Sequence, residues 1–269
     1  MAIRRLLRGR LSWDRLDPVV QAVGERYDVA TDRVELLDAD NWLSTPLVVD
    51  DRLFVKVMSE QNSLVHALLT AGRNLGAFSS GTEGFFEHLG TPLEMAEREL
   101  AATERMRELG VGAPEPLEAF EADGLGVLVL EYLPAFRTLD ELDGGAVAEL
   151  APALFDALAK MHDDGLAHGD LRGENVLVAD GELYFIDATS VRADAVEDAR
   201  AYDVACALAA LEPIVGARIA VRAASSAYSP AVLLEAREFL DFVNFRPDHG
   251  FDAVAVKGEI EKAARAADD

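Results

Sequence analysis

His168-Gly169-Asp170-Leu171-Arg172-Gly173-Glu174-Asn175 is the stretch that decides the interpretation of this sequence, together with the strand, turn and strand predicted over 176–186. Asp187 follows the second of these strands directly. Asp170 and Asn175 lie five residues apart in a loop, so a carboxylate and an amide oxygen can serve one site. Mg²⁺ prefers such oxygen ligands and is commonly held by one or two protein groups plus phosphate oxygens. The spacing therefore predicts a site for magnesium and phosphate.

The stretch 168–175 resembles the catalytic loop of the protein-kinase-like superfamily. It is most similar to the small atypical members: the RIO kinases, the archaeal KEOPS-complex kinase and the aminoglycoside phosphotransferases. This resemblance implies that Asp170 is the catalytic base, that Asn175 and Asp187 bind the metal, and that His168 supports the loop. It also implies ATP as the phosphate donor, with Mg²⁺ or alternatively Mn²⁺ as the cation.

The segment Leu53–Val57 resembles the superfamily strand whose lysine binds the α- and β-phosphates of ATP. Lys56 is the only lysine in the first 159 residues, and the resemblance makes it both an ATP-binding and a catalytic residue. Its expected partner is a glutamate on the helix that follows. We choose Glu99, because the sequence from 99 to 116 resembles the RIO pattern around the paired glutamate; the other candidates on that helix are Glu97 and Glu104.

Two further segments extend the resemblance. Residues 128–133 resemble the hinge between kinase lobes, where the backbone groups of Glu131 and Leu133 would bind adenine. Asp203 resembles the buried aspartate that braces the catalytic loop. His162 is interpreted as a packing residue.

The pattern departs from typical kinases in three places. No glycine occurs between Gly24 and Gly72, so a glycine-rich phosphate loop is missing, and we expect the hydroxyls of Ser44 and Thr45 to contact phosphate instead. No long activation segment follows Asp187. The arginine that senses activation-loop phosphorylation is replaced by glycine at 169.

The order of the predicted elements indicates an α+β chain with a bilobal, protein-kinase-like fold. We expect a helical extension over 1–30, an antiparallel-sheet N-lobe over 31–133 with a mobile insertion at 60–91, and a mostly helical C-lobe over 134–269. The predicted strands cover 34–37, 46–49, 53–57, 117–121, 127–131, 176–179 and 183–186, and the predicted helices cover 13–27, 92–109, 147–161, 196–215, 230–244 and 252–266.

The composition is strongly acidic. The formal net charge is −24, and only four of the 25 basic residues are lysines. Such a balance is typical of proteins from high-salt cells, where a Debye length of about 3 Å at molar ionic strength screens self-repulsion. The balance argues against a protein coated with nucleic acid, because a broad basic face is missing. No apolar run reaches the length of a transmembrane helix, so we expect a cytoplasmic protein without membrane contact.

The one basic segment is 1–11, which carries four arginines. It is either a solvated terminal helix or an arm that docks on RNA or on an acidic partner.

Three functions remain open. The first is a RIO-like serine/threonine kinase or ATPase acting on a protein or a ribosomal particle. The second is a small-molecule kinase of the aminoglycoside-phosphotransferase type. The third is a nucleotide-sensing ribosome assembly factor with little catalysis. We favour the first, because the chain after Asp187 is short and the insertion at 60–91 lies where RIO kinases carry a flexible loop.

Overall fold

The structure, a computed structural model, describes residues 11–37, 44–60, 91–188, 196–245 and 250–268 of the 269-residue chain. The described residues form two compact units. The sheet unit contains those of Met1–Gly72, His88–Arg105 and Pro114–Pro134, and the helical unit contains those of Met106–Ala113 and Ala135–Asp269. The α+β fold class expected from the sequence is confirmed.

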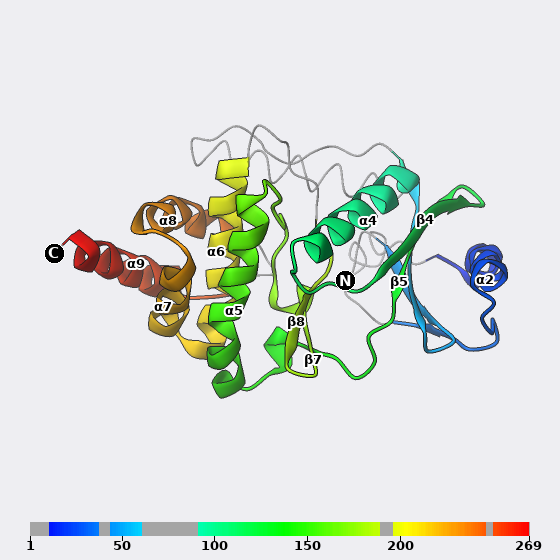
Figure 1. Cartoon of the computed structure of the whole chain (residues 1–269), viewed down its shortest axis with the longest axis horizontal. Coiled ribbons are helices and arrows are strands. Elements are labelled where there is room, and N and C mark those ends of the chain that lie inside the picture. The colour runs from blue at the N-terminus through cyan, green and yellow to red at the C-terminus, as the bar shows by residue number, and fades with distance from the viewer. Residues whose placement is uncertain (1–10, 38–43, 61–90, 189–195, 246–249, 269) are drawn as a thin grey trace. The chain divides into compact units, whose positions relative to one another are not determined.

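The sheet unit is built on five antiparallel strands in the order β1-β2-β3-β5-β4 (Figure 1). Two tight hairpins join β2 to β3 through Asp50-Asp51 and β4 to β5 through Asp123-Gly124, and all four turn residues have positive φ. Aspartate and glycine adopt this backbone at lower cost than most residues, which makes these positions natural hairpin turns. The strands are β1 (Val34–Leu36), β2 (Thr45–Val49), β3 (Leu53–Met58), β4 (Pro116–Ala122) and β5 (Leu125–Glu131).

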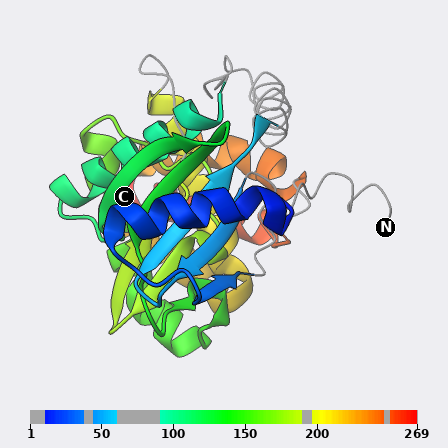
Figure 2. The same cartoon turned by 90° about the vertical axis from the view of Figure 1, so that its right-hand side faces the viewer.

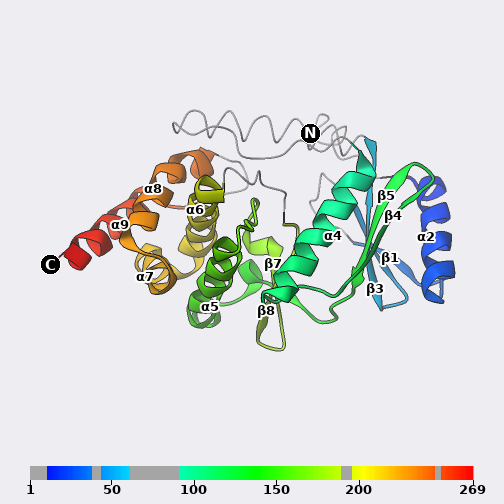
Figure 3. The same ribbon diagram turned by 45° about the horizontal axis from the view of Figure 1, so that its top comes forward.

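One helix covers each face of this sheet, as Figures 2 and 3 show. Helix α2 (Trp13–Tyr27) packs Leu16, Val19, Val20 and Val23 onto one face, where it meets the odd-numbered residues of β2 and β3. Helix α4 (Pro92–Glu108) packs Met95 and Ala96 onto the other face, against Met58, Leu128 and Leu130. Because side chains alternate along a strand, the even-numbered residues of β3 point towards α4. This alternation decides where the lysine of β3 lies.

Helix α4 begins as the sequence predicts. The Glu94 N–H donates to the Thr91 hydroxyl at 3.2 Å, and the Thr91 N–H donates to the Glu94 carboxylate at 3.1 Å. This reciprocal pair is a capping box, which satisfies two donors that a helix start otherwise leaves open.

The helical unit contains five helices and a small sheet of order β6-β7-β8 among its described residues (Figure 1). The helices are α5 (Gly144–Asp163), α6 (Val196–Val215), α7 (Ala217–Ala227), α8 (Pro230–Phe245) and α9 (Ala253–Asp268). The strands are β6 (Arg137–Thr138), β7 (Val176–Ala179) and β8 (Glu182–Phe185), with the short 3₁₀ turns η1 (Leu139–Glu141) and η2 (Gly173–Asn175).

Helix α7 and strand β6 were not expected from the sequence. The buried side of α7 consists mainly of Ala217, Ala220, Val221 and Ala224, which follow helical spacing but carry little apolar surface. The helix packs against α5, α6 and α9, so tertiary contacts rather than local hydrophobicity stabilise it.

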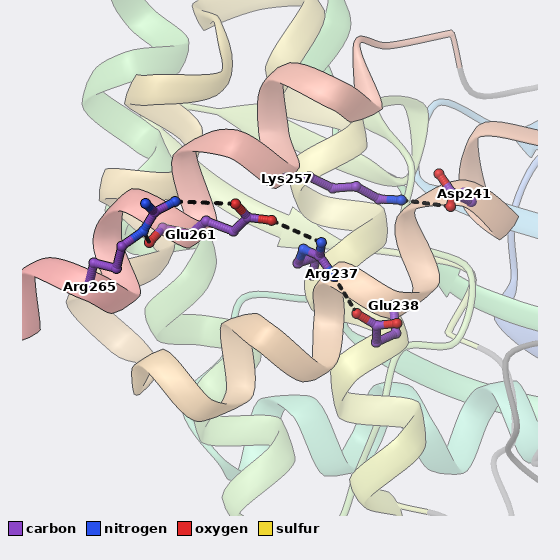
Figure 4. A network of polar contacts seen from close by, with 6 residues as sticks. All are labelled: Arg237, Glu238, Asp241, Lys257, Glu261 and Arg265. Atoms are coloured by element: carbon purple, nitrogen blue, oxygen red, sulfur yellow. Dashed lines mark hydrogen bonds and ion pairs between the residues drawn. The ribbon is translucent and has the colours of Figure 1, made fainter. Parts of the chain in front are cut away.

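Ion pairs connect α8 to α9 on the surface of the helical unit (Figure 4). The Arg237 guanidinium lies 2.9 Å from Glu261, and the Lys257 ammonium lies 2.6 Å from Asp241. The Asp241 side chain is 78% exposed, so each such pair contributes little, within about 1 kcal/mol.

Several expectations fall on residues outside the described ranges. The basic segment 1–11 is described only at Leu11, and the insertion expected at 60–91 is described only at its two ends. Within the described ranges, no helix combines the length and the apolar character that crossing a membrane would require.

Candidate active site

The loop between α5 and β7 carries Asp170 and Asn175. The Asn175 Nδ2 donates to the backbone carbonyl of Asp170 at 2.8 Å, which ties the two residues together. Both are buried, with 6% of Asp170 and 3% of Asn175 exposed. Because the amide nitrogen of Asn175 is used within the loop, its Oδ1 atom is the one suited to a cation.

Asp203 of α6 holds the backbone of this loop. Its Oδ2 accepts the His168 N–H at 2.6 Å, and its Oδ1 accepts the Gly169 N–H at 2.8 Å. Asp203 is completely buried. Gly169 has φ 80, in the left-handed region that favours glycine. Gly169 replaces the arginine of typical kinases, and its backbone conformation suits a residue without Cβ.

His168 is a neutral structural residue of the loop. Its Nε2 lies 2.9 Å from the carbonyl oxygen of Ile186, which can only accept, so Nε2 carries the proton. The Asp170 N–H donates to the other ring nitrogen at 3.4 Å. Burial lowers the pKa of His168, and the nearby carboxylates of Asp203, Asp170 and Asp187 oppose this shift. One imidazole therefore connects the loop to the end of β8.

Asp187 lies beside Asn175, because Val176 of β7 pairs with Phe185 of β8 and the Ile186 N–H donates to the Asn175 carbonyl at 3.1 Å. Asp187 has φ 62, a conformation that is uncommon for residues other than glycine and that concentrates at functional sites.

The two side chains suit a hard cation. An amide oxygen and a carboxylate are ligands that Mg²⁺ accepts, with phosphate oxygens and water completing its shell. In the part of the chain that the structure describes, no group of three or more His, Cys, Asp or Glu could hold a metal alone. A magnesium site shared with phosphates does not need such a group.

Arg172 lies between the carboxylates of Asp170 and Glu174 in the loop. Its guanidinium lies 3.5 Å from Asp170 Oδ2 and forms an ion pair with Glu174. Burial raises the pKa of Glu174, and the positive charge of Arg172 partly offsets this rise. Asp140, Asp170 and Asp187 raise it further, so Arg172 is the cation that balances a concentrated negative charge.

Lys56 and Glu99 form a buried ion pair within the sheet unit. The ammonium lies 2.7 and 2.9 Å from the two carboxylate oxygens, and the side chains are 5% and 12% exposed. Lys56 is an even-numbered residue of β3, so it points to the α4 face, where Glu99 lies one turn beyond Met95 and Ala96. The glutamate chosen from the sequence is the one that the structure pairs with Lys56.

The other expected ATP-binding residues also lie in the sheet unit. Thr45 pairs with Val57, and the side chain of Val57 belongs to the core under α2. Paired residues share a face of the sheet, so the Thr45 side chain points away from the face of Lys56. Continued by one residue, the same alternation turns Ser44 towards that face. Both hydroxyls are buried without a hydrogen-bond partner among the described residues. At the end of β5, the Glu131 N–H donates to the Glu115 carbonyl at 2.9 Å, so an adenine contact at Glu131 would fall to its carbonyl. Leu133 follows two residues after this strand.

Sequence reasoning missed part of the polar network behind the loop. His162, interpreted as a packing residue, lies 3.1 Å from Asp203 through Nε2 and 2.7 Å from the Tyr228 hydroxyl through Nδ1. Tyr228 was not singled out at all. Its partner lies 66 residues away, and no local spacing reveals such a contact.

The chain is similar to known proteins over part of its length. Residues 86–206 match the family described as the RIO domain. The KEOPS complex subunit Bud32 of Pyrococcus abyssi is 29% identical over 115 residues, which are 41% of this chain and 51% of that protein. A Methanothermobacter thermautotrophicus protein named "Probable bifunctional tRNA threonylcarbamoyladenosine biosynthesis protein" is 30% identical over 102 residues, or 38% of this chain and 18% of that one. The chain thus spans about half the length of the first relative and less than a fifth of the second.

A solved structure supports the fold as well. A candidate fructosamine-3-kinase from Haemophilus somnus aligns with a TM-score of 0.50 and 11% identity, over 92% of this chain and 97% of that one. At this identity the likeness concerns the fold alone. Together these similarities support an atypical, RIO-type protein-kinase-like protein.

Proposed function

We propose that this chain is an ATP- and magnesium-dependent RIO-like phosphotransferase that uses Asp170 as its catalytic base. The observation that carries the proposal is the arrangement of the loop: Asn175 is fixed to the backbone of Asp170, and Asp187 follows the strand that pairs with the one after Asn175. Phosphoryl transfer needs little covalent help from the protein, so positioning and charge stabilisation are the main tasks. These residues are suited to both.

Each residue has a separate task. Asp170 orients the acceptor hydroxyl and accepts its proton. Asn175 Oδ1 and the Asp187 carboxylate hold the cation, which neutralises phosphate charge when it is bound. Lys56 binds the α- and β-phosphates, and Glu99 keeps its ammonium in place, since a buried lysine without a carboxylate partner would lose its charge.

The sheet unit supplies the remaining nucleotide contacts in this proposal. Ser44 is the better of the two hydroxyl candidates for phosphate, because strand alternation turns Thr45 to the α2 face. The adenine would bind the backbone carbonyl of Glu131 and the backbone of Leu133.

We propose a protein serine or threonine as the acceptor, within a protein assembly. The name of the Pyrococcus abyssi relative supports a partner of the KEOPS type. A ribosomal particle, reached through the arginines of segment 1–11, is a second partner to test. Hydrolysis with water as the acceptor is compatible with the same residues.

The proposal is tested by ATP consumption. Purified protein is incubated with Mg²⁺ and ATP in molar KCl, alone and with KEOPS-type partner proteins or ribosomal subunits, and any phosphorylated residue is mapped. We expect magnesium-dependent turnover that Asp170→Ala abolishes. Turnover that persists in Asp170→Ala, or that does not depend on a divalent cation, would overturn the proposal. Arg237→Ala, in the surface ion pairs of α8 and α9, is the control and should turn over as the wild type does.

A further inference from the structure

A buried chain of polar groups runs behind the catalytic loop through three helices of the helical unit. It consists of Tyr228 at the end of α7, His162 on α5 and Asp203 on α6. The Tyr228 hydroxyl lies 2.7 Å from His162 Nδ1, and His162 Nε2 lies 3.1 Å from Asp203 Oδ2. The exposed fractions are 8%, 7% and 0% for Tyr228, His162 and Asp203. All three hydrogen-bonded side chains are therefore shielded from water.

The carboxylate of Asp203 fixes the direction of its hydrogen bond with His162, and a neutral imidazole then fixes the direction of the bond with Tyr228. The Asp203 carboxylate can only accept, so His162 Nε2 carries a proton and donates it. A neutral imidazole then has a lone pair on Nδ1, and the Tyr228 hydroxyl donates to that lone pair. Asp203 also accepts the N–H groups of His168 and Gly169. Asp203 is thus the shared acceptor of the His162 ring and of two backbone N–H groups of the loop.

The carboxylate of Asp203 selects one tautomer of His162, and the hydroxyl of Tyr228 lies at the ring nitrogen that this tautomer leaves unprotonated. With the proton on Nδ1 instead, the lone pair of Nε2 would face the carboxylate of Asp203, and the two acceptors would repel each other. Packing alone does not require a tyrosine, since an aromatic ring is enough for the edge-to-face contact with Phe155, at 6.3 Å between ring centroids. The hydroxyl is what a phenylalanine would lack.

We infer that Tyr228 is a positioning residue for the catalytic loop: its hydroxyl fixes His162, which together with Asp203 holds the backbone at His168 and Gly169 next to Asp170. The tyrosine touches no reacting atom and acts through the other two side chains. The inference rests on the proposed function only where it concerns turnover. The effect on the loop backbone stands by itself.

The first test is a spectroscopic measurement on the wild-type protein. Nitrogen NMR of the His162 ring reports which ring nitrogen carries the proton. We expect a neutral ring with the proton on Nε2. A ring that is protonated on Nδ1 in the wild type would overturn the inference without any variant.

The second test compares Tyr228→Phe with Tyr27→Phe. The control loses a part-buried hydroxyl, 3.4 Å from Glu118, in the sheet unit. We expect amide hydrogen exchange at His168 and Gly169 to speed up about tenfold in Tyr228→Phe, because the local opening becomes easier, and to stay unchanged in Tyr27→Phe. Exchange rates at both amides that stay within about twofold of the wild type in Tyr228→Phe would refute the inference.

Turnover separates this inference from the proposed function. If the protein transfers phosphate, Tyr228→Phe should lower kcat about three- to tenfold while the KM for ATP stays within about twofold, since the nucleotide contacts are intact. A protein that never turns over would refute the proposed function, whereas the ring spectrum and the amide exchange would still decide the role of Tyr228.

Discussion

Asp203→Asn is the substitution whose cost can be worked out most directly from the structure. The carboxylate accepts three N–H groups, from the backbone of His168 at 2.6 Å, the backbone of Gly169 at 2.8 Å and the ring of His162 at 3.1 Å. Asparagine has nearly the same shape but presents an NH₂ group where one oxygen was. In either orientation that group meets at least one of these donors, and the site is too buried for water to help.

The least costly arrangement places the NH₂ group opposite Gly169. One charge-assisted hydrogen bond is then lost, at about 1.5–3 kcal/mol, and the other two become neutral bonds that are each weaker by about 1 kcal/mol. The expected loss is therefore about 3.5–5 kcal/mol in the free energy of unfolding. That is a large share of the roughly 5–15 kcal/mol that stabilises a typical domain.

Urea unfolding in molar KCl, followed by circular dichroism, measures this loss, since urea adds no salt. Asp241→Asn is the matched control, because it removes an exposed carboxylate from an ion pair with Lys257 (Figure 4) and should cost less than about 1 kcal/mol. A loss below about 1 kcal/mol for Asp203→Asn, or equal losses for both variants, would refute the assignment of Asp203 as the charged acceptor that holds the loop.

Three further predictions concern stability. Burial lowers the pKa of His168, so below about pH 6.5 the unfolded chain binds a proton that the folded chain does not. The free energy of unfolding should therefore fall as the pH drops below that value, by at most about 1.4 kcal/mol per pH unit. In His168→Gln, whose side-chain amide keeps an N–H donor, the urea midpoint should fall less steeply between about pH 7.5 and 5.5. Gly112→Ala should destabilise the protein by about 1–3 kcal/mol, since the new Cβ would lie 2.0 Å from the carbonyl oxygen of Leu183. Its control is Gly258→Ala in α9, where a Cβ meets no neighbouring atom and should stabilise the protein by up to about 1 kcal/mol. Urea unfolding that finds Gly112→Ala more stable than Gly258→Ala would contradict this prediction. Ala135 has φ 57, so Ala135→Gly should raise the thermal midpoint or leave it unchanged, and a clear decrease would show that no strain is relieved.

Local patterns were enough to predict most elements of the fold and the pairing of Lys56. Turn residues with positive φ, such as Asp180-Gly181, specify hairpins within a few residues of the chain. Strand alternation then decides which face each side chain occupies. The same alternation assigns Thr45 to the face of Leu47 rather than to that of Lys56.

What the sequence did not reveal depends on contacts between distant segments. Helix α7 was missed because its buried face consists mainly of alanines, which bury little apolar surface, although their spacing is helical. The role of His162 was missed because its two partners lie 41 and 66 residues further along the chain. A histidine on an apolar helix face looks the same in sequence whether it only packs or links a tyrosine to an aspartate.

Binding of magnesium nucleotide to two variants tests the central claim most directly. Labelled ATP is titrated into Asp187→Ala and Asp170→Ala in molar KCl, with and without Mg²⁺. Asp187→Ala should weaken magnesium-dependent binding at least about tenfold, because it removes a cation ligand, whereas Asp170→Ala should bind almost as the wild type does and lose only phosphate transfer. Equal affinities of the two variants for magnesium nucleotide would contradict the roles assigned to the loop and to the end of β8.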